Sequence, residues 1–351
     1  MGFFTEEIIR WYEINKRSMP WRETKDPYLV WISEIMLQQT RVNQALPFFN
    51  RFIAEFPDVF SLSKAKEDRV LRLWQGLGYY SRARNLHFTA KHLVRSFGGS
   101  LPENYQEIIA LKGIGDYTAS AILSISFNKP HPVIDGNVER VLSRYGGISD
   151  PVNSPEGKKK IRLLAEKFLD RLDPGTYNQA IMEFGSLQCV PSSPDCRICP
   201  LNESCFAFRK EKVDLLPVKL RKVPVKTRYL DFFFISDSKK VMIEKRVKND
   251  IWKNLYQLPM IESAAQLSIT RLRRDAAFVK MMGSSDMKLE KLFEMSHPLT
   301  HQLLHIRVFS TNPESRRDAL FVDRKWVKID QFDKYAFPKP LEIFFNMLKR
   351  G

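Results

Sequence analysis

The spacing of the apolar residues changes once along the chain, near residue 210. From Phe3 to about Phe208 the apolar residues recur three or four positions apart, which is the period of a half-buried helix. Frequent prolines and glycines divide this stretch into about ten short helices. The pattern therefore predicts a mostly helical domain over residues 1–209.

The pattern becomes that of strands in the last third of the chain. Residues 210–228 are basic and contain two prolines, which predicts an extended linker. Residues 229–236 and 240–246 are β-branched or aromatic runs separated by the turn-prone Asp237–Ser238, which predicts a hairpin. An α+β domain over residues 229–351 is predicted, with further strands at 305–310 and 325–329 and helices at 269–282 and 340–349.

The charge balance indicates a class of partner. The 351 residues include 56 Lys and Arg against 40 Asp and Glu, a formal net charge of +16. Such a surplus attracts polyanions and favours nucleic acid over an anionic membrane surface. Apolar runs such as Phe232–Ile235 are far shorter than the roughly 20 residues of a membrane-spanning helix. The N-terminus carries no recognisable targeting signal, so we expect a cytoplasmic protein that does not bind membranes. We also expect a monomer.

All four cysteines lie in one short stretch, residues 189–205. Their spacing is C-x6-C-x2-C-x5-C, from Cys189 through Cys196 and Cys199 to Cys205. This crowding is typical of a ligand set rather than of a disulfide framework. Only the central pair matches a zinc knuckle, whereas four thiolates can each bind one corner of an iron–sulfur cubane. The spacing favours an iron–sulfur cluster, and the alternatives are a zinc site and four unligated cysteines.

A glycine-containing hairpin is a candidate phosphate site. Leu111-Lys112-Gly113-Ile114-Gly115 separates two helical stretches, and the second helix begins near Asp116. Glycines let backbone N–H groups approach a phosphate, and the helix N-terminus adds partial positive charge. The segment is either a phosphate-binding turn or an ordinary helix–helix turn. The basic run 157–162 is likewise either a phosphate contact or a solvated helix face.

Two carboxylates have contrasting surroundings. Glu34 lies within the apolar run Leu29–Leu37, which predicts the raised pKa that a general acid needs. Asp135 precedes a predicted helix, where it can cap the N-terminus and where the helix dipole is expected to lower its pKa. A proton donor together with a permanent anion suits a transition state with a cationic sugar. Each residue also has a purely structural interpretation, in which Glu34 simply lies on the polar face of a helix and Asp135 only caps one.

In combination these features resemble the helix-hairpin-helix DNA glycosylase superfamily. The resemblance rests on the cysteine spacing, the Leu111–Gly115 hairpin and Asp135 at the next helix start. Pro20–Arg22, Ser33–Thr40 and Gly76–Arg82 narrow the resemblance to the adenine DNA glycosylase branch. It covers essentially the whole chain, because residues 229–347 are similar to the Nudix-like C-terminal domain of that branch.

The resemblance implies a fold, a cofactor and a reaction. The fold is a mostly α helix-hairpin-helix glycosylase domain with a [4Fe-4S] cluster loop at residues 189–205, followed by an α+β Nudix-like domain. The reaction is hydrolysis of the N-glycosidic bond of adenine opposite 8-oxoguanine or guanine in double-stranded DNA, with the nucleotide flipped out. Glu34 would protonate adenine and Asp135 would stabilise the oxocarbenium sugar, with support from Tyr117 and Asn137.

Tyr117 distinguishes two branches of the superfamily. Endonuclease III-like members have a lysine at this point of the hairpin motif, and its amine forms the Schiff base that leads to strand cleavage. Tyrosine has no such amine, so the resemblance implies a monofunctional glycosylase. The alternatives are an endonuclease III-like glycosylase/lyase and a noncatalytic lesion-binding protein, although the latter would be expected to have lost Glu34 or Asp135.

The resemblance also implies where DNA binds. Gln39 and Tyr79 would wedge into the base stack, while Thr40 and Leu77 would lie near 8-oxoguanine. Lys112, Gly113 and Gly115 would form the phosphate-binding turn. The adenine pocket would be formed by Trp21, Arg22, Leu37 and Gln179.

The C-terminal domain departs from two patterns. Many relatives have Phe-Ser-His in the loop that inspects 8-oxoguanine, where this chain has Met295-Ser296-His297, so Ser296 and His297 retain the polar functions. Residues 267–282 carry Arg271, Arg273, Arg274 and Lys280 against a single acid, Asp275. This composition argues against the Mg²⁺ site of a catalytic Nudix hydrolase. The domain is therefore predicted to read DNA rather than to hydrolyse nucleotides.

Overall fold

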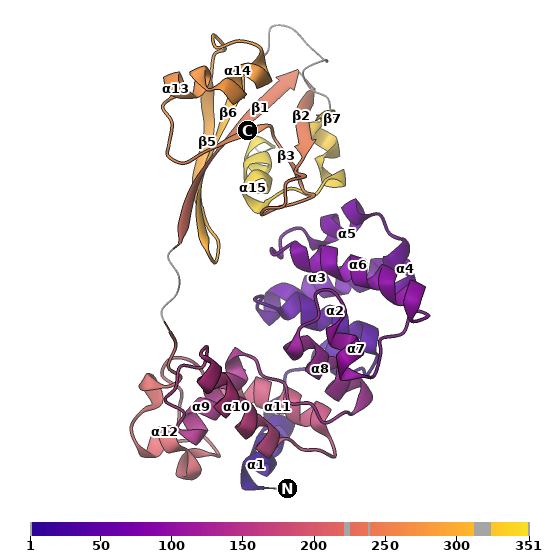
Figure 1. The fold of residues 1–351 in the computed structure, drawn as a ribbon, viewed down its shortest axis with the longest axis vertical. Coiled ribbons are helices and arrows are strands. Elements are labelled where there is room, and N and C mark those ends of the chain that lie inside the picture. The colour runs from indigo at the N-terminus through magenta and orange to yellow at the C-terminus, as the bar shows by residue number, and fades with distance from the viewer. Residues whose placement is uncertain (1, 221–224, 238, 312–323, 350–351) are drawn as a thin grey trace. The chain divides into compact units, whose positions relative to one another are not determined.

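Figure 1 shows the chain in a computed structural model that describes residues 2–220, 225–237, 239–311 and 324–349. The chain divides into two compact units. The first combines Met1–Lys64 with Asn85–Arg221, and the second combines Ala65–Arg84 with Lys222–Gly351. The second unit therefore includes a helical segment from within the predicted helical domain. This grouping depends on contacts between distant parts of the sequence, so the spacing of apolar residues could not reveal it.

The chain is helical from Phe3 to Arg209, which confirms the predicted class of the first domain. The α-helices are α1 (Phe3–Asn15), α2 (Pro27–Leu37), α3 (Val42–Glu55), α4 (Val59–Lys64), α5 (Glu67–Trp74), α6 (Ser81–Ser96), α7 (Tyr105–Ile109), α8 (Asp116–Phe127), α9 (Gly136–Gly146), α10 (Pro155–Phe168), α11 (Pro174–Leu187) and α12 (Phe206–Arg209).

Capping side chains begin several of these helices. Asp26, Asn104, Ser154 and Asp173 each accept a hydrogen bond from a backbone N–H in the first turn of α2, α7, α10 and α11, respectively. Each bond satisfies a donor that has no partner within the helix. These local signals explain why the helices start where they do. Among the described residues, no helix is both long and apolar enough to cross a bilayer.

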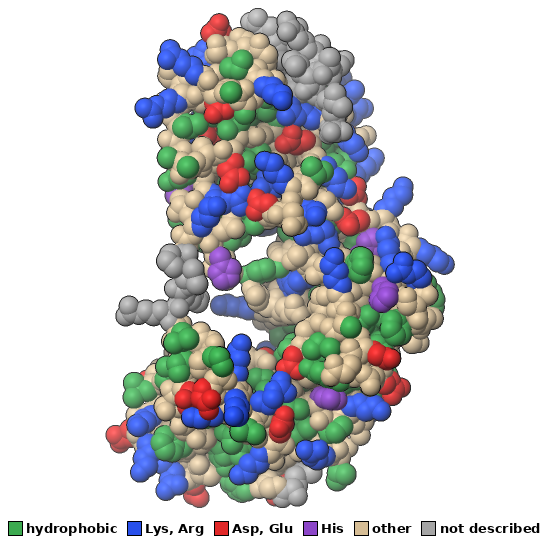
Figure 2. All heavy atoms as spheres, viewed as in Figure 1, with side chains coloured by type: hydrophobic (Ala, Val, Ile, Leu, Met, Phe, Trp, Pro, Cys, Tyr) green, Lys and Arg blue, Asp and Glu red, His purple; other side chains and the backbone are tan. Residues whose placement is uncertain are grey.

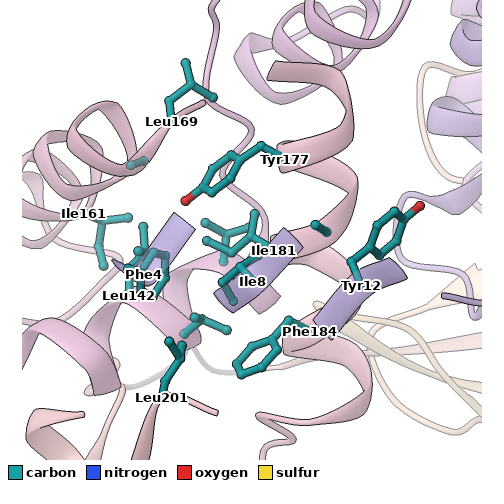
Figure 3. Packing of buried hydrophobic residues seen from close by; sticks show 14 of the residues in the cluster. Phe4, Ile8, Tyr12, Leu142, Ile161, Leu169, Tyr177, Ile181, Phe184 and Leu201 are labelled. Atoms are coloured by element: carbon teal, nitrogen blue, oxygen red, sulfur yellow. The ribbon is translucent and has the colours of Figure 1, made fainter. Parts of the chain in front are cut away.

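An apolar core joins α1, α9 and α11 in the first unit (Figure 3). Phe4, Ile8 and Tyr12 follow one another at intervals of four residues and lie on one face of α1. They pack with Phe184 of α11 and Leu142 of α9. Burial of each large apolar side chain stabilises the fold by roughly 1.5–3 kcal/mol. The core thus fixes α9 and α11, which carry several of the candidate site residues.

A mixed sheet organises the second unit (Figure 1). The strand order is β3-β2-β1-β6-β5, with β4 paired to β1 and β7 paired to β2. β1 and β6 are parallel, and the other paired strands are antiparallel. The elements are β1 (Lys226–Asp237), β2 (Lys240–Lys245), β3 (Tyr256–Gln257), β4 (Met260–Ser263), α13 (Ile269–Arg274), α14 (Ala276–Met282), β5 (Glu290–Pro298), β6 (Gln302–Thr311), β7 (Arg324–Lys328) and α15 (Lys339–Leu348).

Helices cover both faces of this sheet. Phe233 and Phe234 are neighbours in β1, so their side chains point to opposite faces. Phe233 packs against Phe278 of α14, in a cluster that also contains Leu272 of α13. Phe234 contacts Phe344 of α15, with ring centroids 5.7 Å apart. α13 and α14 therefore cover one face, and α15 covers the other.

Polar contacts attach α5 to this unit. Asp68 accepts hydrogen bonds from Lys245 Nζ at 2.6 Å and from Tyr256 Oη at 3.1 Å. Gln75, which directly follows α5, accepts a hydrogen bond on Oε1 from the backbone N of Phe337 at 3.1 Å. These contacts hold α5 and the residue that follows it against the sheet domain.

The predicted elements of the second unit are largely present. β1 and β2 form the predicted hairpin, with Asp237 opposite Lys240, whereas Ser238 of the predicted turn lies outside the described residues. The predicted helix over residues 269–282 is instead two helices. Asp275 ends α13 in an extended conformation and caps α14 by accepting from the backbone N of Ala277 at 2.8 Å. An aspartate favours such a cap over a helix interior.

The predicted linker, residues 210–228, is partly folded. β1 begins at Lys226, so the last residues of this segment belong to the sheet. Near the other end, the backbone N of Val152 donates to Val218 O, and the backbone N of Leu220 donates to Asn153 Oδ1, both at 2.9 Å. The described part of this segment up to residue 220 is therefore attached to the first unit.

Candidate active site

A cavity of ≈ 170 Å³ in the first unit brings together residues that lie far apart in the sequence. Side chains from α2, α8 and α11 line it, together with the segments that precede α2 and α9. Its lining includes all the residues predicted for catalysis and for the adenine pocket and one predicted DNA contact: Trp21, Arg22, Glu34, Leu37, Thr40, Tyr117, Asp135, Asn137 and Gln179.

Glu34 has the environment predicted for a proton donor. Its side chain is buried within α2, and Tyr117 Oη donates a hydrogen bond to Glu34 Oε2 at 2.6 Å. Burial raises the pKa of Glu34 to about 7; the charge of Asp135 adds to this effect, while the hydrogen bond from Tyr117 and the charge of Arg22 oppose it. The predicted direction of the pKa shift is confirmed. Near neutral pH this carboxyl group can both hold and release a proton.

Asp135 caps α9 as predicted. Its Oδ1 accepts from the backbone N of Asn137 at 2.9 Å and of Val138 at 2.8 Å, and its Oδ2 accepts from Asn137 Nδ2 at 2.7 Å. The prediction of a lowered pKa is wrong, because burial raises the pKa of Asp135 by more than these hydrogen bonds and Arg140 lower it. The hydrogen bonds nevertheless stabilise the anion and fix its orientation.

Tyr117 supplies a hydroxyl group to the cavity. Its Oη also lies 3.7 Å from Met182 Sδ. Burial, followed by the charges of Glu34 and Asp135, raises the pKa of Tyr117 well above its usual value. The hydroxyl therefore keeps its proton and acts as a donor to Glu34. The residues lining this cavity include no lysine, so it offers no side-chain amine for a Schiff base.

Glu183 and Arg17 line the same cavity, although the sequence did not point to them. Glu183 accepts hydrogen bonds from Arg17 Nε at 2.7 Å and Nη2 at 2.6 Å, and from Arg22 Nη2 at 2.8 Å. Burial acts to raise the pKa of Glu183, but the arginines outweigh it and lower the pKa to about 2. The signal was available in the helical spacing, because Gln179 and Glu183 are one turn apart on α11.

Trp21 supplies an apolar wall and also belongs to the core. It is buried, and its ring meets that of Phe49 edge to face at a centroid distance of 5.1 Å. A cavity with apolar walls and a few fixed polar groups is typical of a site that encloses a planar heterocycle. The structural and the pocket interpretations of Trp21 are therefore compatible.

The four cysteines line a separate cavity of ≈ 30 Å³ in the first unit. Arg144 donates to Cys189 Sγ at 3.4 Å and to the carbonyl oxygens of Val190 and Pro191 at 2.7 and 2.9 Å. Within the described part of the chain, no three His, Cys, Asp or Glu side chains are arranged to hold a metal ion.

Arg140 connects the cysteine loop with the cap of α9. Its Nε donates to the backbone O of Cys189 at 2.7 Å, and its Nη2 donates to Asn137 Oδ1 at 3.0 Å. Asn137 in turn donates to Asp135. A continuous set of hydrogen bonds therefore runs from the cysteine loop to a carboxylate of the cavity.

The Leu111–Gly115 hairpin joins α7 to α8, as predicted. The backbone N of Ile114 donates to Leu111 O at 3.1 Å, which closes the turn. Gly113 has φ +88°, and a Cβ there would lie 2.6 Å from Asn85 Cβ, so the turn requires glycine. Gly115 is the N-cap of α8, and a Cβ there would meet open space. The exposed backbone at this helix N-terminus leaves room for a phosphate.

Lys112 adds a positive charge to this hairpin. The side chain is exposed, and its Nζ lies 4.6 Å from the ring centroid of Phe88. Figure 2 shows Lys and Arg side chains scattered over the visible surface, in keeping with the net charge of +16. The hairpin therefore lies on a molecule whose surface attracts polyanions.

In the second unit, a cavity of ≈ 520 Å³ contains three of the predicted DNA contacts, Leu77, Tyr79 and His297. Tyr79 has φ +47°, and its hydroxyl is hydrogen-bonded to Thr300 Oγ1. Burial lowers the pKa of His297, which favours its neutral form. Gln39, with φ +57°, is exposed in the first unit and lines neither this cavity nor the smaller one.

Met295–His297 lie in strand β5 rather than in a loop, which corrects the sequence prediction. Ser296 is opposite His305 of β6, and its Oγ lies 3.0 Å from His305 Nδ1. The turn between β5 and β6 is Leu299–His301, and all three of its residues line the cavity of the second unit, whereas Ser296 does not. The strand was missed because a register shift between Lys291 and Phe293 interrupts the alternation of its side chains, and because the polar His297 takes one of the half-buried positions that follow.

Family models match both parts of the chain. A model described as HhH-GPD superfamily base excision DNA repair protein matches residues 32–171. A second model, described as NUDIX domain, matches residues 232–347. These matches agree with the hairpin between α7 and α8 and with the sheet domain.

Individual proteins and structures are similar as well. The adenine DNA glycosylase of Buchnera aphidicola subsp. Schizaphis graminum is 34% identical, over 99% of each chain. The protein of the same name from Buchnera aphidicola subsp. Acyrthosiphon pisum is 36% identical, over 99% of this chain and 98% of the relative. The solved structure of a thermostable thymine-DNA glycosylase matches with a TM-score of 0.55 and 28% identity, over 59% of this chain and 95% of the other.

Proposed function

Because the chain belongs to the adenine DNA glycosylase family of base excision repair, we propose that it is a monofunctional enzyme acting on adenine opposite 8-oxoguanine or guanine. The enzyme hydrolyses N-glycosyl bonds, and its substrate is DNA. The proposal assigns the chemistry to the ≈ 170 Å³ cavity that contains Glu34 and Asp135. The observation that carries it is the meeting of Glu34 and Asp135 in one cavity, with the hydroxyl of Tyr117, rather than an amine, hydrogen-bonded to Glu34.

Glu34 is the proposed general acid. Adenine is a poor leaving group as an anion, so protonation of a ring nitrogen is needed before the glycosidic bond breaks. A carboxyl group with a pKa near the operating pH is suited to give this proton and then to help activate water. Tyr117 orients the carboxyl group through its 2.6 Å hydrogen bond.

Asp135 is the proposed stabiliser of the sugar cation. Loss of adenine leaves positive charge on the deoxyribose, and a fixed carboxylate lowers the energy of that state. The hydrogen bonds from Asn137 and Val138 orient the carboxylate before the reaction begins. Arg22, Gln179 and Glu183 supply polar groups for the base, between the apolar walls of Trp21 and Leu37.

Cys189, Cys196, Cys199 and Cys205 are proposed to hold a [4Fe-4S] cluster. Their common cavity and the guanidinium of Arg144 beside Cys189 Sγ support this assignment, since the cation balances thiolate charge. When bound, the cluster would cross-link the loop at residues 189–205. The assignment is tested by measuring the iron and sulfide content and the visible absorbance of the purified protein. One zinc ion per chain without iron would contradict it.

The DNA contacts are proposed on both units. The Leu111–Gly115 hairpin with Lys112 is assigned to phosphate, and Gln39 and Tyr79 to the disturbed base stack. Thr40 and Leu77 are assigned to the region around 8-oxoguanine. His297 is assigned to the same recognition, and Thr300 joins it because its hydroxyl lies at the β5–β6 turn against Tyr79. Ser296, which the sequence suggests for this recognition, is not assigned to it, because its Oγ faces His305 and the residue does not line the cavity.

Adenine release from a duplex with 8-oxoguanine opposite the adenine tests the proposed function, with excision of thymine glycol as the comparison. Rapid adenine release with no thymine glycol excision is the expected result. Borohydride reduction during turnover should trap little covalent protein–DNA adduct, because Tyr117 provides no amine. Abundant adduct or preferential thymine glycol excision would support an endonuclease III-like lyase instead.

A further inference from the structure

Tyr12 contacts the cavity from the apolar core. It belongs to α1, is 4% exposed and packs in the cluster with Ile8 and Phe184. In Figure 3 its hydroxyl points away from the cluster. The hydroxyl lies 3.0 Å from Oε1 of Gln179, a residue that lines the ≈ 170 Å³ cavity.

The direction of this hydrogen bond determines which end of the Gln179 amide is available. Burial raises the pKa of Tyr12, against the opposing charge of Arg22, so the hydroxyl keeps its proton and donates a hydrogen bond to Gln179 Oε1. Gln179 Oε1 is therefore the acceptor. Among the described residues none accepts a hydrogen bond from Gln179 Nε2, which leaves the amide N–H groups to a ligand.

We propose that Tyr12 is a positioning residue that fixes the amide of Gln179 so that Nε2 donates to a ring nitrogen of the target adenine. The proposal rests on the assignment of this cavity to adenine and states how one edge of the base is read. The unprotonated ring nitrogens of adenine are acceptors and match an N–H donor. A rotated amide would present an oxygen to the same nitrogen, and two acceptors repel each other.

Two tyrosines of the same core provide a matched pair of variants. Tyr12→Phe removes the hydroxyl that contacts Gln179. Tyr177→Phe removes a hydroxyl that is buried in the same cluster and has no hydrogen-bond partner among the described residues. Figure 3 shows this second hydroxyl directed toward the cluster interior. Both changes keep the ring, so both variants are expected to fold and to give wild-type circular dichroism spectra.

The full-length protein is tested by binding to duplexes with 8-oxoguanine opposite a 2′-fluorinated, non-hydrolysable target nucleotide. The target base is adenine or one of its 1-deaza, 3-deaza and 7-deaza analogues, each of which lacks one ring acceptor. Tyr12→Phe is expected to weaken binding of the adenine duplex about 3- to 10-fold, the usual range for one hydrogen bond. For the analogue without the nitrogen that Nε2 contacts, the variant and the wild type are expected to bind equally.

The pattern across the analogues separates positioning from a general structural role. A structural defect would weaken all four duplexes by the same factor, and Tyr177→Phe would act in the same way as Tyr12→Phe. Either result would overturn the proposal. If the wild type excises no adenine, the proposed function is wrong. If the wild type excises adenine normally but Tyr12→Phe behaves in the same way as Tyr177→Phe, only the role proposed for Tyr12 is wrong.

A second variant keeps the test independent of the folding of Tyr12→Phe. Gln179→Glu retains an acceptor and loses both N–H donors. This variant is expected to bind the adenine duplex more weakly than the wild type does. It is also expected to bind the adenine duplex and the duplex with the analogue that lacks the contacted nitrogen with equal affinity. If Gln179→Glu discriminates among the four bases as the wild type does, the amide does not donate to the base and the proposal is wrong.

Discussion

Tyr117 Oη donates a 2.6 Å hydrogen bond to Glu34 Oε2, at a carboxyl group whose pKa burial raises to about 7. The two effects oppose each other, because the hydrogen bond stabilises the carboxylate while burial stabilises the acid. Their balance keeps the proton of Glu34 transferable near neutral pH. A lysine at position 117 would instead place a second charge and an amine nucleophile beside this carboxyl group.

Glu34→Gln is expected to bind the lesion duplex and to release adenine at least about 100-fold more slowly, since the general acid is lost. Single-turnover adenine release and Kd for the duplex are the measurements. Glu139→Gln is a suitable control, because burial also raises the pKa of Glu139 but that residue does not line the cavity. If Glu34→Gln released adenine at the wild-type rate, or if both variants lost the same share of that rate, Glu34 would not be the general acid.

Adenine release should decrease above pH 7, because only the protonated form of Glu34 can donate. With a pKa of about 7, the single-turnover rate at pH 8 is expected to be roughly one tenth of its plateau value. Tyr117→Phe removes the hydrogen bond that lowers this pKa, so it should move the alkaline limb to higher pH. A shift to lower pH, or no shift, would contradict the electrostatic role given to Tyr117.

The same carboxyl group makes stability depend on pH. Its folded-state pKa of about 7 lies above the ordinary value of 4.5, so its contribution is fully present below pH 4.5 and is lost as the pH rises through 7. Glu34→Gln removes this dependence. Relative to the wild type, the variant should gain about 2–3 kcal/mol in unfolding free energy between pH 5 and pH 8. Denaturant unfolding of both proteins at the two pH values measures this difference, and parallel pH curves would contradict it.

The sequence predicted the direction of the pKa shift of Glu34 but not that of Asp135. The apolar neighbours of Glu34 were visible as a run in α2, so its raised pKa could be predicted. For Asp135 the cap was predictable from local sequence, but the extent of burial was not. Because burial depends on α8 and α11 as well as α9, only the folded chain shows that it outweighs the cap.

Contacts across the sequence account for the remaining differences. Arg17 and Glu183 meet only because α1 packs against α11, and neither residue belongs to a recognisable local motif. β5 was missed because a register shift interrupts its alternation near Lys291 and because polar residues follow, and this placed Ser296 in a loop. The association of α5 with the sheet domain depends on contacts such as that of Asp68 with Lys245, which lie 177 residues apart in the sequence.

Thr300 and Ser296 offer a direct test of which part of the β5–β6 hairpin reads 8-oxoguanine. Thr300→Val, which removes the hydroxyl but keeps a β-branched side chain, is expected to reduce the preference for 8-oxoguanine over guanine about 3- to 10-fold. His297→Ala should act in the same direction. Ser296→Ala is the control and should leave the preference unchanged, since Ser296 faces His305. The preference is measured by comparing adenine-release rates from a duplex with 8-oxoguanine opposite the adenine and from one with guanine. If Ser296→Ala reduced the preference and Thr300→Val did not, the recognition role would belong to Ser296.

Lys112 should contribute one phosphate contact to DNA binding. Its side chain is exposed at the hairpin, and among the described residues no carboxylate forms an ion pair with it. Lys112→Ala is expected to reduce the slope of log Kd against log salt concentration by about 0.9, the value for one phosphate neutralised on duplex DNA. Lys160→Ala provides the comparison from the basic run 157–162, because Lys160 already pairs with Asp150 at 2.6 Å. An unchanged slope for Lys160→Ala would mean that this position of the run is a solvated helix face. An unchanged slope for Lys112→Ala would contradict the phosphate contact given to Lys112.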